Sequence, residues 1–183
     1  MSMRSALLVA ACALALASIT ALASAAALAA DSPNLGRPAT AEEIAAWDIS
    51  IGPDGAGLPA GSGTAKQGEA VYAAKCLACH GEKGAGKPND LLVGGQGTIA
   101  GDKPAVKTVG SYWPYATTVF DYVRRAMPYS ESKSLTNDEV YAVSAYILNL
   151  NGIIAEGDTI DAQTLPKVKM PNREGFVPFA RGK

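Results

Sequence analysis

Apolar side chains recur at helical spacing in three stretches of this 183-residue chain. Two of these stretches follow capping boxes, Thr64 with Gln67 and Thr136 with Glu139, in which the two side chains can satisfy the first backbone N–H groups of a helix. The third stretch begins at Pro114, and proline favours the first turn of a helix. The pattern therefore predicts an all-α domain of three core helices with little regular sheet.

Glycine and proline interrupt the pattern elsewhere. Residues 81–110 contain many glycines and few periodic apolar positions, which predicts a long loop between the first and second core helices. Thr40 with Glu43 forms another capping box, so we expect a short helix upstream of the core. Asn151-Gly152 is a typical stop signal and predicts the end of the third core helix.

The first thirty residues form a run rich in alanine and leucine. The run has an early positive charge at Arg4 and ends in Ala27-Leu28-Ala29, a small-x-small cleavage sequence. It predicts a cleaved signal peptide over residues 1–30 and export to the periplasm. Two alternatives stay open: a lipoprotein with Cys12 as the lipidated residue, and an uncleaved membrane anchor, since residues 6–30 are long enough to span a bilayer.

Cys76-Leu77-Ala78-Cys79-His80 carries the strongest chemical signal in the chain. Two cysteines separated by two residues and followed directly by histidine form the attachment signature of a c-type haem. Each thiol can add to one vinyl group of the porphyrin, and the imidazole of His80 then serves as an axial iron ligand. The sequence therefore predicts one covalently bound haem c held by Cys76, Cys79 and His80, and no catalytic residue.

Other uses of Cys76 and Cys79 have less support. A structural zinc site needs four ligands, and no cysteine or histidine lies downstream of His80. A thioredoxin-like redox pair would follow a strand, whereas this pair follows a helical stretch. A disulfide between the two cysteines would be strained at this spacing. Because no other cysteine lies beyond the leader, two thioether bonds would leave no thiol to carry a sulfur substrate.

The second axial ligand of the iron can be narrowed by elimination. His80 is the only histidine, and a methionine thioether is the usual partner of histidine in electron-carrying cytochromes c. Beyond the leader the chain offers Met127, which lies between the second and third core helices, and Met170, about twenty residues past the last helix. We expect Met127 to bind the iron and Met170 to pack in a core. If neither binds, the iron would be five-coordinate or take lysine or water, and chemistry with gases or peroxide would become available.

Charge adds one expectation and excludes one class of partner. With 16 basic and 17 acidic residues, the chain lacks the dense basic face of a nucleic-acid-binding protein. Several lysines nevertheless bracket the haem-attachment stretch and could steer an acidic redox partner toward it, or could simply be solvated surface charges. They are Lys75, Lys83, Lys87, Lys103 and Lys107.

These features divide the chain into four parts. We expect the signal peptide over residues 1–30, an irregular N-terminal extension over 31–63, a haem domain over 64–151 and an irregular C-terminal extension over 152–183. The two extensions are rich in proline and glycine. They could clasp a partner protein or wrap the chain's own domain.

The attachment pentad, the Met127-Pro128 pair and the capped helix that ends in Ala145-Tyr146-Ile147-Leu148 resemble a class I cytochrome c. That resemblance implies three core helices around one haem and iron ligation by His80 and Met127. Further stretches resemble the haem subunits of periplasmic molybdenum-dependent sulfane and sulfite dehydrogenases. They are residues 35–49, 110–115, 124–128 and 166–172.

The narrower resemblance implies a one-electron carrier, not an enzyme. Its electron donor would be a molybdenum-containing sulfite or sulfane dehydrogenase, and its acceptor a downstream cytochrome or terminal oxidase. A membrane would be involved only if the leader is not cleaved. One departure matters: the haem subunit of sulfane dehydrogenase typically carries two haem domains, whereas this chain has one pentad. A general diffusible electron carrier is thus one alternative, and a haem enzyme or gas sensor with an open distal position is another.

Overall fold

The computed structural model describes residues 35–102 and 104–177, which fall into two units, Met1–Trp47 and Asp48–Lys183. The predicted leader, residues 1–30, lies outside the described residues. In the first unit, α2 (Ala41–Trp47) is the short helix predicted from the capping box, and the backbone N–H of Thr40 donates to the Glu43 carboxylate at 2.9 Å. None of the helices among the described residues has the length and apolar character needed to cross a membrane.

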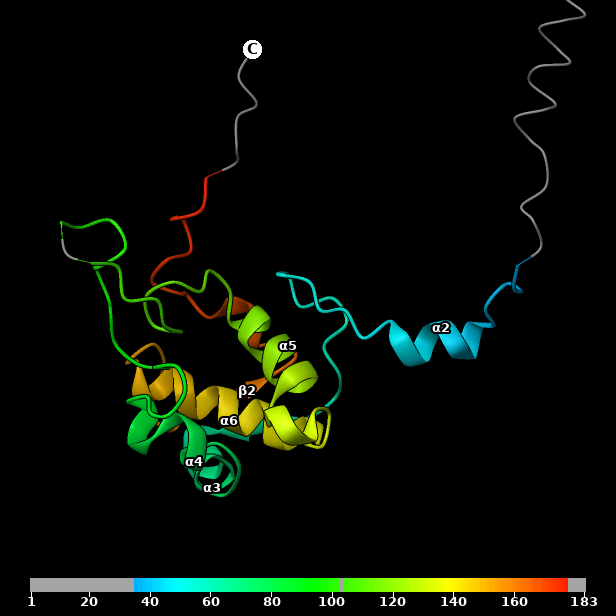
Figure 1. Cartoon of the computed structure of the whole chain (residues 1–183), viewed down its shortest axis with the longest axis horizontal. Helices are drawn as coiled ribbons and strands as arrows, with labels where there is room; N and C mark the ends of the chain where they lie inside the picture. Colours follow the sequence, from blue (N-terminus) through cyan, green and yellow to red (C-terminus); the bar gives the residue numbers. More distant parts are fainter. Residues whose placement is uncertain (1–34, 103, 178–183) are drawn as a thin grey trace, which may run out of the picture. The chain divides into compact units, whose positions relative to one another are not determined.

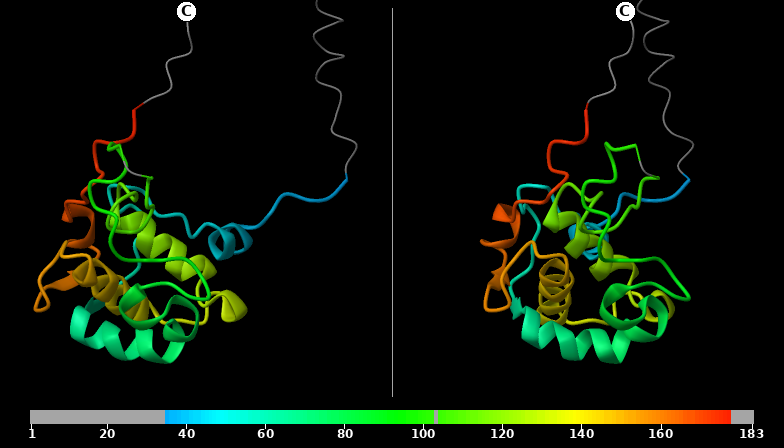
Figure 2. Two further views of the ribbon diagram at one scale, coloured as in Figure 1. Left: turned by 60° about the vertical axis from the view of Figure 1, so that its left-hand side comes forward. Right: turned by 90° about the vertical axis from the view of Figure 1, so that its left-hand side faces the viewer.

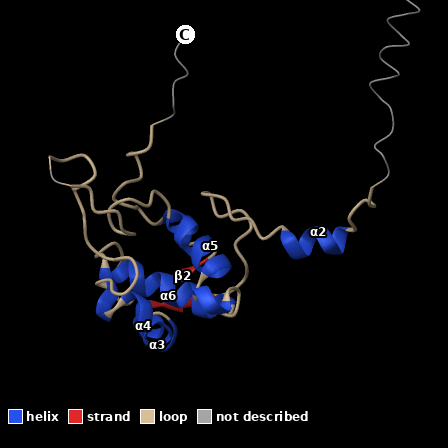
Figure 3. Cartoon of the chain, in the orientation of Figure 1, coloured by secondary structure: helices blue, strands red, loops and turns tan. Residues whose placement is uncertain are grey.

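The second unit contains the three predicted core helices (Figure 1). They are α3 (Ala65–Lys75), α5 (Ala116–Ala126) and α6 (Asn137–Leu150). Both predicted capping boxes form, because the Thr64 and Thr136 hydroxyls accept from the backbone N–H of Gln67 and Glu139, each at 3.3 Å. Figure 3 shows that loops make up most of the remainder. Shorter pieces are α4 (Leu77–His80) and the single turns η1 (Glu82–Gly84), η2 (Tyr129–Glu131) and η3 (Leu165–Lys167).

The helices α3 and α6 cross with their backbones almost in contact. A Cβ atom added to Gly68 would lie 1.9 Å from the carbonyl oxygen of Ala142. One turn further along, the rings of Tyr72 and Tyr146 pack with their centroids 5.3 Å apart. Glycine at this position therefore sets the distance between the two helices, and the aromatic pair fills the space where they diverge.

The core lies between α5 and α6. The rings of Phe120 and Tyr141 are fully buried and 4.4 Å apart, and the Tyr141 hydroxyl donates to the carbonyl of Pro59 at 2.8 Å. Burial raises the pKa of Tyr141 to about 12, so the phenol stays neutral. Other fully buried apolar side chains of this core are Val140, Val143, Ala145 and Leu148.

The C-terminal extension folds back on the rest of the second unit as far as Asn172. Its strand β2 (Thr159–Asp161) pairs antiparallel with β1 (Ser62–Thr64), with Gly63 opposite Ile160. Leu165 and Met170 are buried in the core, and the Asn172 side chain donates to the carbonyl of Tyr112 at 2.8 Å. Figure 2 shows this segment, orange to red, lying against α5 and α6. The described part of this extension therefore wraps its own domain.

Gly68→Ala tests the helix crossing. Alanine should favour α3 by about 1 kcal/mol through its intrinsic helix propensity. The added methyl group meets the Ala142 carbonyl, however, so we expect a net loss of about 1–3 kcal/mol in the free energy of unfolding. Thermal and denaturant unfolding followed by far-UV circular dichroism would measure it.

Gly157→Ala is the matched control, because a Cβ atom at Gly157 meets nothing within 4 Å. Its unfolding free energy should stay within about 0.5 kcal/mol of the parent. If Gly68→Ala were as stable as Gly157→Ala, the close approach of α3 and α6 would not limit the fold.

Candidate haem site

The two cysteines of the pentad lie directly after the end of α3. Lys75 is the last residue of α3, Cys76 bends the backbone out of the helix, and α4 carries the rest of the pentad. Cys76 is half-buried and Cys79 is exposed, and both are free thiols rather than a disulfide. Burial, with a smaller contribution from Cys79, raises the pKa of the Cys76 thiol to about 11. Within residues 35–102 and 104–177, no group of three or more histidine, cysteine and acidic side chains is placed to hold a metal ion.

A backbone carbonyl orients His80. The Nδ1 atom of His80 lies 2.8 Å from the carbonyl oxygen of Asp90. A carbonyl can only accept, so Nδ1 must carry the proton and donate. In the neutral imidazole, this tautomer leaves the lone pair on Nε2, which is the atom available to bind a metal. The donor set of two free thiols and one oriented imidazole fits the attachment of haem c.

Hydrogen bonds hold the loop that supplies this carbonyl. Asn89 N–H donates to the Cys79 carbonyl at 2.9 Å, and Gly86 N–H donates to the His80 carbonyl at 2.8 Å. Gly81 has a φ of 72°, and a Cβ atom there would lie 2.6 Å from the Gly86 carbonyl oxygen, so the turn after His80 requires glycine. The loop therefore returns directly to the pentad.

Tyr72 joins α3 to the same turn. Its hydroxyl donates to the Gly81 carbonyl at 2.8 Å, and only 2% of the residue is exposed. Burial raises the pKa of the phenol, which stays protonated and able to donate. The sequence shows neither this bond nor the acceptor of His80, because each acceptor is a backbone carbonyl that carries no residue-type signal.

The structure separates the two candidate methionines by their surroundings. Met170 is 3% exposed and belongs to the buried core. Met127 is half-buried at the end of α5, in extended backbone, with its N–H bonded to the Val123 carbonyl at 3.0 Å. The thioether of Met170 is enclosed by other core side chains and is not accessible to an iron. The half-buried Met127 keeps part of its side chain accessible.

One ion pair links the segments of Met127 and the pentad. Lys75 Nζ, on the residue before Cys76, lies 3.1 Å from Glu131 Oε2 in the turn that follows Met127-Pro128. Both side chains are largely exposed, so the pair contributes little stability, but it brings the two segments to the same part of the molecule. Several apolar side chains are half-buried and pack against the core, as residues flanking an apolar macrocycle would be. They are Cys76, Leu92, Trp113, Met127 and Leu135.

The lysines proposed to steer a partner differ in their surroundings. Lys75 is paired with Glu131, Lys107 lies 5.1 Å from the centre of the Tyr112 ring, and Lys103 falls outside the described residues. Lys83 and Lys87 are exposed on the loop after His80. They are the best placed of the group to meet a partner near the pentad.

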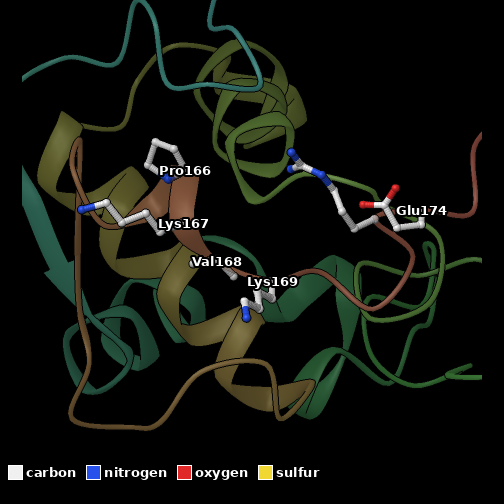
Figure 4. Close-up of a pocket in the computed structure, with 6 residues that line it drawn as sticks. Pro166, Lys167, Val168, Lys169 and Glu174 are labelled. Atoms are coloured by element: carbon white, nitrogen blue, oxygen red, sulfur yellow. The ribbon is translucent and has the colours of Figure 1, made fainter.

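A second basic surface lies along the C-terminal extension. A depression of about 410 Å³ lies there, and five of the residues that line it are labelled in Figure 4. Arg173 also lines it, and its guanidinium lies over the Tyr115 ring, 4.2 Å from the ring centre. The other lining residues are Pro166, Lys167, Val168, Lys169 and Glu174. The sequence alone does not reveal this surface, because nothing in the pattern of residues indicates that Tyr115 lies next to Arg173.

Known proteins resemble this arrangement in sequence and in fold. Residues 63–147 match the family described as cytochrome C oxidase, cbb3-type, subunit III. A chain in the crystal structure of the sulfane dehydrogenase SoxCD from Paracoccus pantotrophus is 42% identical, with a TM-score of 0.75, over 82% of this chain and 74% of that chain. The chain belongs to the class I c-type cytochromes.

A curated relative matches part of the chain. The cytochrome is 29% identical over 106 residues to a thiosulfate dehydrogenase of Psychrobacter arcticus (strain DSM 17307 / VKM B-2377 / 273-4). The match covers 56% of the cytochrome and 32% of the relative, so the cytochrome spans about a third of the length of that protein.

Family membership confirms several predictions. The all-α class I fold, haem c as the type of cofactor and an electron-transfer role are as expected from the sequence. The covalent bonds, the number of haems and the ligands His80 and Met127 stay predictions.

Proposed function

We propose that this cytochrome carries one haem c and accepts electrons singly from a molybdenum-dependent sulfite or sulfane dehydrogenase in the periplasm. It would pass them to a downstream cytochrome or terminal oxidase. The observation that carries the proposal is the single attachment pentad, with His80 oriented by the Asp90 carbonyl, in a chain 42% identical to one from a sulfane dehydrogenase structure.

The proposed site assigns one role to each residue. Cys76 and Cys79 would form the thioether bonds to the haem, and His80 Nε2 and the Met127 thioether would be the two protein ligands of its iron. The half-buried position of Met127, and the core position of Met170, favour this choice of methionine. Haem c supplies the one-electron redox change, and the thioether ligand favours its ferrous state.

Two filled axial positions leave no place for a substrate on the iron. The protein would then exchange electrons with partner proteins through the edge of the cofactor and would have no catalytic residues of its own. An open distal position would instead favour the alternative class, a haem enzyme or gas sensor.

The proposed domain organisation keeps residues 64–151 as the haem domain. The signal peptide over 1–30 directs export, and the extensions 31–63 and 152–183 flank the domain. The pairing of Gly63 with Ile160 joins parts of both extensions beside α6. Because the C-terminal extension packs on its own domain as far as Asn172, we assign partner binding to the N-terminal extension, which includes α2 with Ile44 exposed.

Covalent attachment predicts that haem survives denaturation. Haem staining after denaturing electrophoresis should mark a band at the mass of the cleaved chain. Cys76→Ser and Cys79→Ser should each retain at most one thioether bond and give a weaker, less stable haemoprotein. Staining that disappears on denaturation of the parent protein would contradict covalent attachment.

The distal ligand is tested by comparing the two methionines. Met127→Ala should abolish the weak sulfur-to-iron charge-transfer band of the ferric protein, lower the reduction potential and allow the ferrous protein to bind carbon monoxide, because the thioether is lost. Met170→Ala should keep the band but lose about 2–5 kcal/mol of unfolding free energy, because it opens a cavity in the core. The opposite pattern would make Met170 the ligand, and a band that survives in both variants would exclude both.

The proposed donor is tested by reduction in the presence of sulfite. The ferric protein should be reduced when sulfite and a purified molybdenum sulfite dehydrogenase are both present, and should be inert toward sulfite alone. Ferrous absorption bands followed by stopped flow would measure the rate. Reduction by sulfite alone would indicate a haem enzyme, and no reduction with the dehydrogenase would leave a general electron carrier.

The same assay tests steering by the exposed lysines. Lys83→Gln/Lys87→Gln should slow reduction at low ionic strength and should reduce its dependence on salt. Lys167→Gln/Lys169→Gln removes the same charge from the C-terminal depression and is the matched control. Equal effects of the two pairs would mean that net charge matters and that the lysines after His80 have no special position.

A further inference from the structure

Asn151, at the end of α6, makes contacts that the proposed site does not use. Its side-chain nitrogen donates to the Ile147 carbonyl at 2.9 Å and to the Leu92 carbonyl at 3.2 Å. Its side-chain oxygen accepts from the Gly94 N–H at 3.0 Å. One amide therefore closes the last turn of α6 and binds a loop segment 57 to 59 residues away in sequence.

The surroundings of this amide leave it little freedom. A Cβ atom added to the buried Gly110 would lie 2.0 Å from Asn151 Oδ1 and 2.7 Å from Gln96 Nε2. Gln96 also donates to the backbone carbonyl of Asn151 at 3.3 Å. Asn151 is thus a junction at which the middle of the long loop, residues 92–96, and its last residue, Gly110, meet the end of α6.

The loop residues bonded to Asn151 lie close to Asp90, the acceptor of His80, along the chain. Asp90 stands between Asn89, whose N–H is bonded to the Cys79 carbonyl, and Leu92, whose N–H is bonded to the Gly84 carbonyl at 2.9 Å. The other polar backbone group of Leu92, its carbonyl, is bonded to Asn151. The segment that presents the Asp90 carbonyl is therefore held at its upstream end by the pentad and at its downstream end by Asn151.

We propose that Asn151 is a positioning residue that, through Leu92 and Gly94, holds the Asp90 carbonyl against His80 Nδ1–H and so contributes to setting the reduction potential. This inference rests on the proposed role of His80 as the proximal ligand. A well-aligned acceptor on Nδ1–H makes the imidazole more basic at Nε2 and stabilises ferric iron. Loss of alignment therefore raises the potential.

The experiment compares two asparagines on the same helix end. Asn151→Ala should raise the midpoint potential of the full-length holoprotein. In NMR spectra of the diamagnetic ferrous protein, it should also speed exchange of the His80 Nδ1 proton about tenfold, as expected for the loss of about one hydrogen bond. Asn151→Ser, which is too short to reach Leu92, should give the same two changes and replaces the alanine variant if that variant does not fold.

Asn149→Ala is the matched control, because Asn149 Nδ2 donates at 3.0 Å to the Ile154 carbonyl and not to the loop. It should lower stability while leaving both the potential and the proton exchange unchanged. Equal shifts in Asn149→Ala, or a folded Asn151 variant with unchanged potential and exchange, would overturn the positioning role. If His80 is not the ligand, the parent protein itself will lack the low-spin spectrum and the Met127-dependent band, which separates failure of the proposed function from failure of this inference.

Discussion

The close approach of α3 and α6 is the constraint on which the rest of the structure depends. Gly68 lets the α3 backbone lie directly on Ala142. One turn later, the packed rings of Tyr72 and Tyr146 stabilise the crossing of the two helices. The position of α3 fixes where Cys76 leaves the helix, and the Tyr72 hydroxyl extends this control to the turn that follows the pentad. The chemistry of the pentad therefore depends on a contact between two helix backbones several residues away.

The same helix pair also organises the long loop, through α6. The loop over residues 81–110 has no regular structure beyond one turn in its described part. Backbone groups in its first half are nevertheless bonded to the pentad, at Gly86 and Asn89, and to Asn151, at Leu92 and Gly94. Hydrogen bonds to fixed points replace regular secondary structure there. A loop held in this way can present a single carbonyl to His80 in a constant position, which a mobile loop could not.

Signals made by residues close together in the sequence predict the core helices and the haem-attachment pentad. The capping boxes at Thr64 and Thr136 and the pentad depend on residues close together in sequence, and the helices form where those signals place them. The pairing of β1 with β2 was not predictable, because each strand has three residues and no alternating pattern can be read from so short a run. The acceptor of His80 was missed for a different reason: it is a backbone carbonyl, which any residue type provides.

The two methionines show what the structure adds to an argument by elimination. The sequence leaves Met127 and Met170 chemically equal, and both precede proline. The structure distinguishes them by burial: Met170 fills the core under the C-terminal extension, while Met127 stands half-buried on a segment that Lys75 and Glu131 tie to the pentad. A core methionine could reach the iron only by leaving a cavity behind, at a cost of several kcal/mol, whereas Met127 has no such cost. Packing energy, rather than ligand chemistry, thus determines which thioether is available.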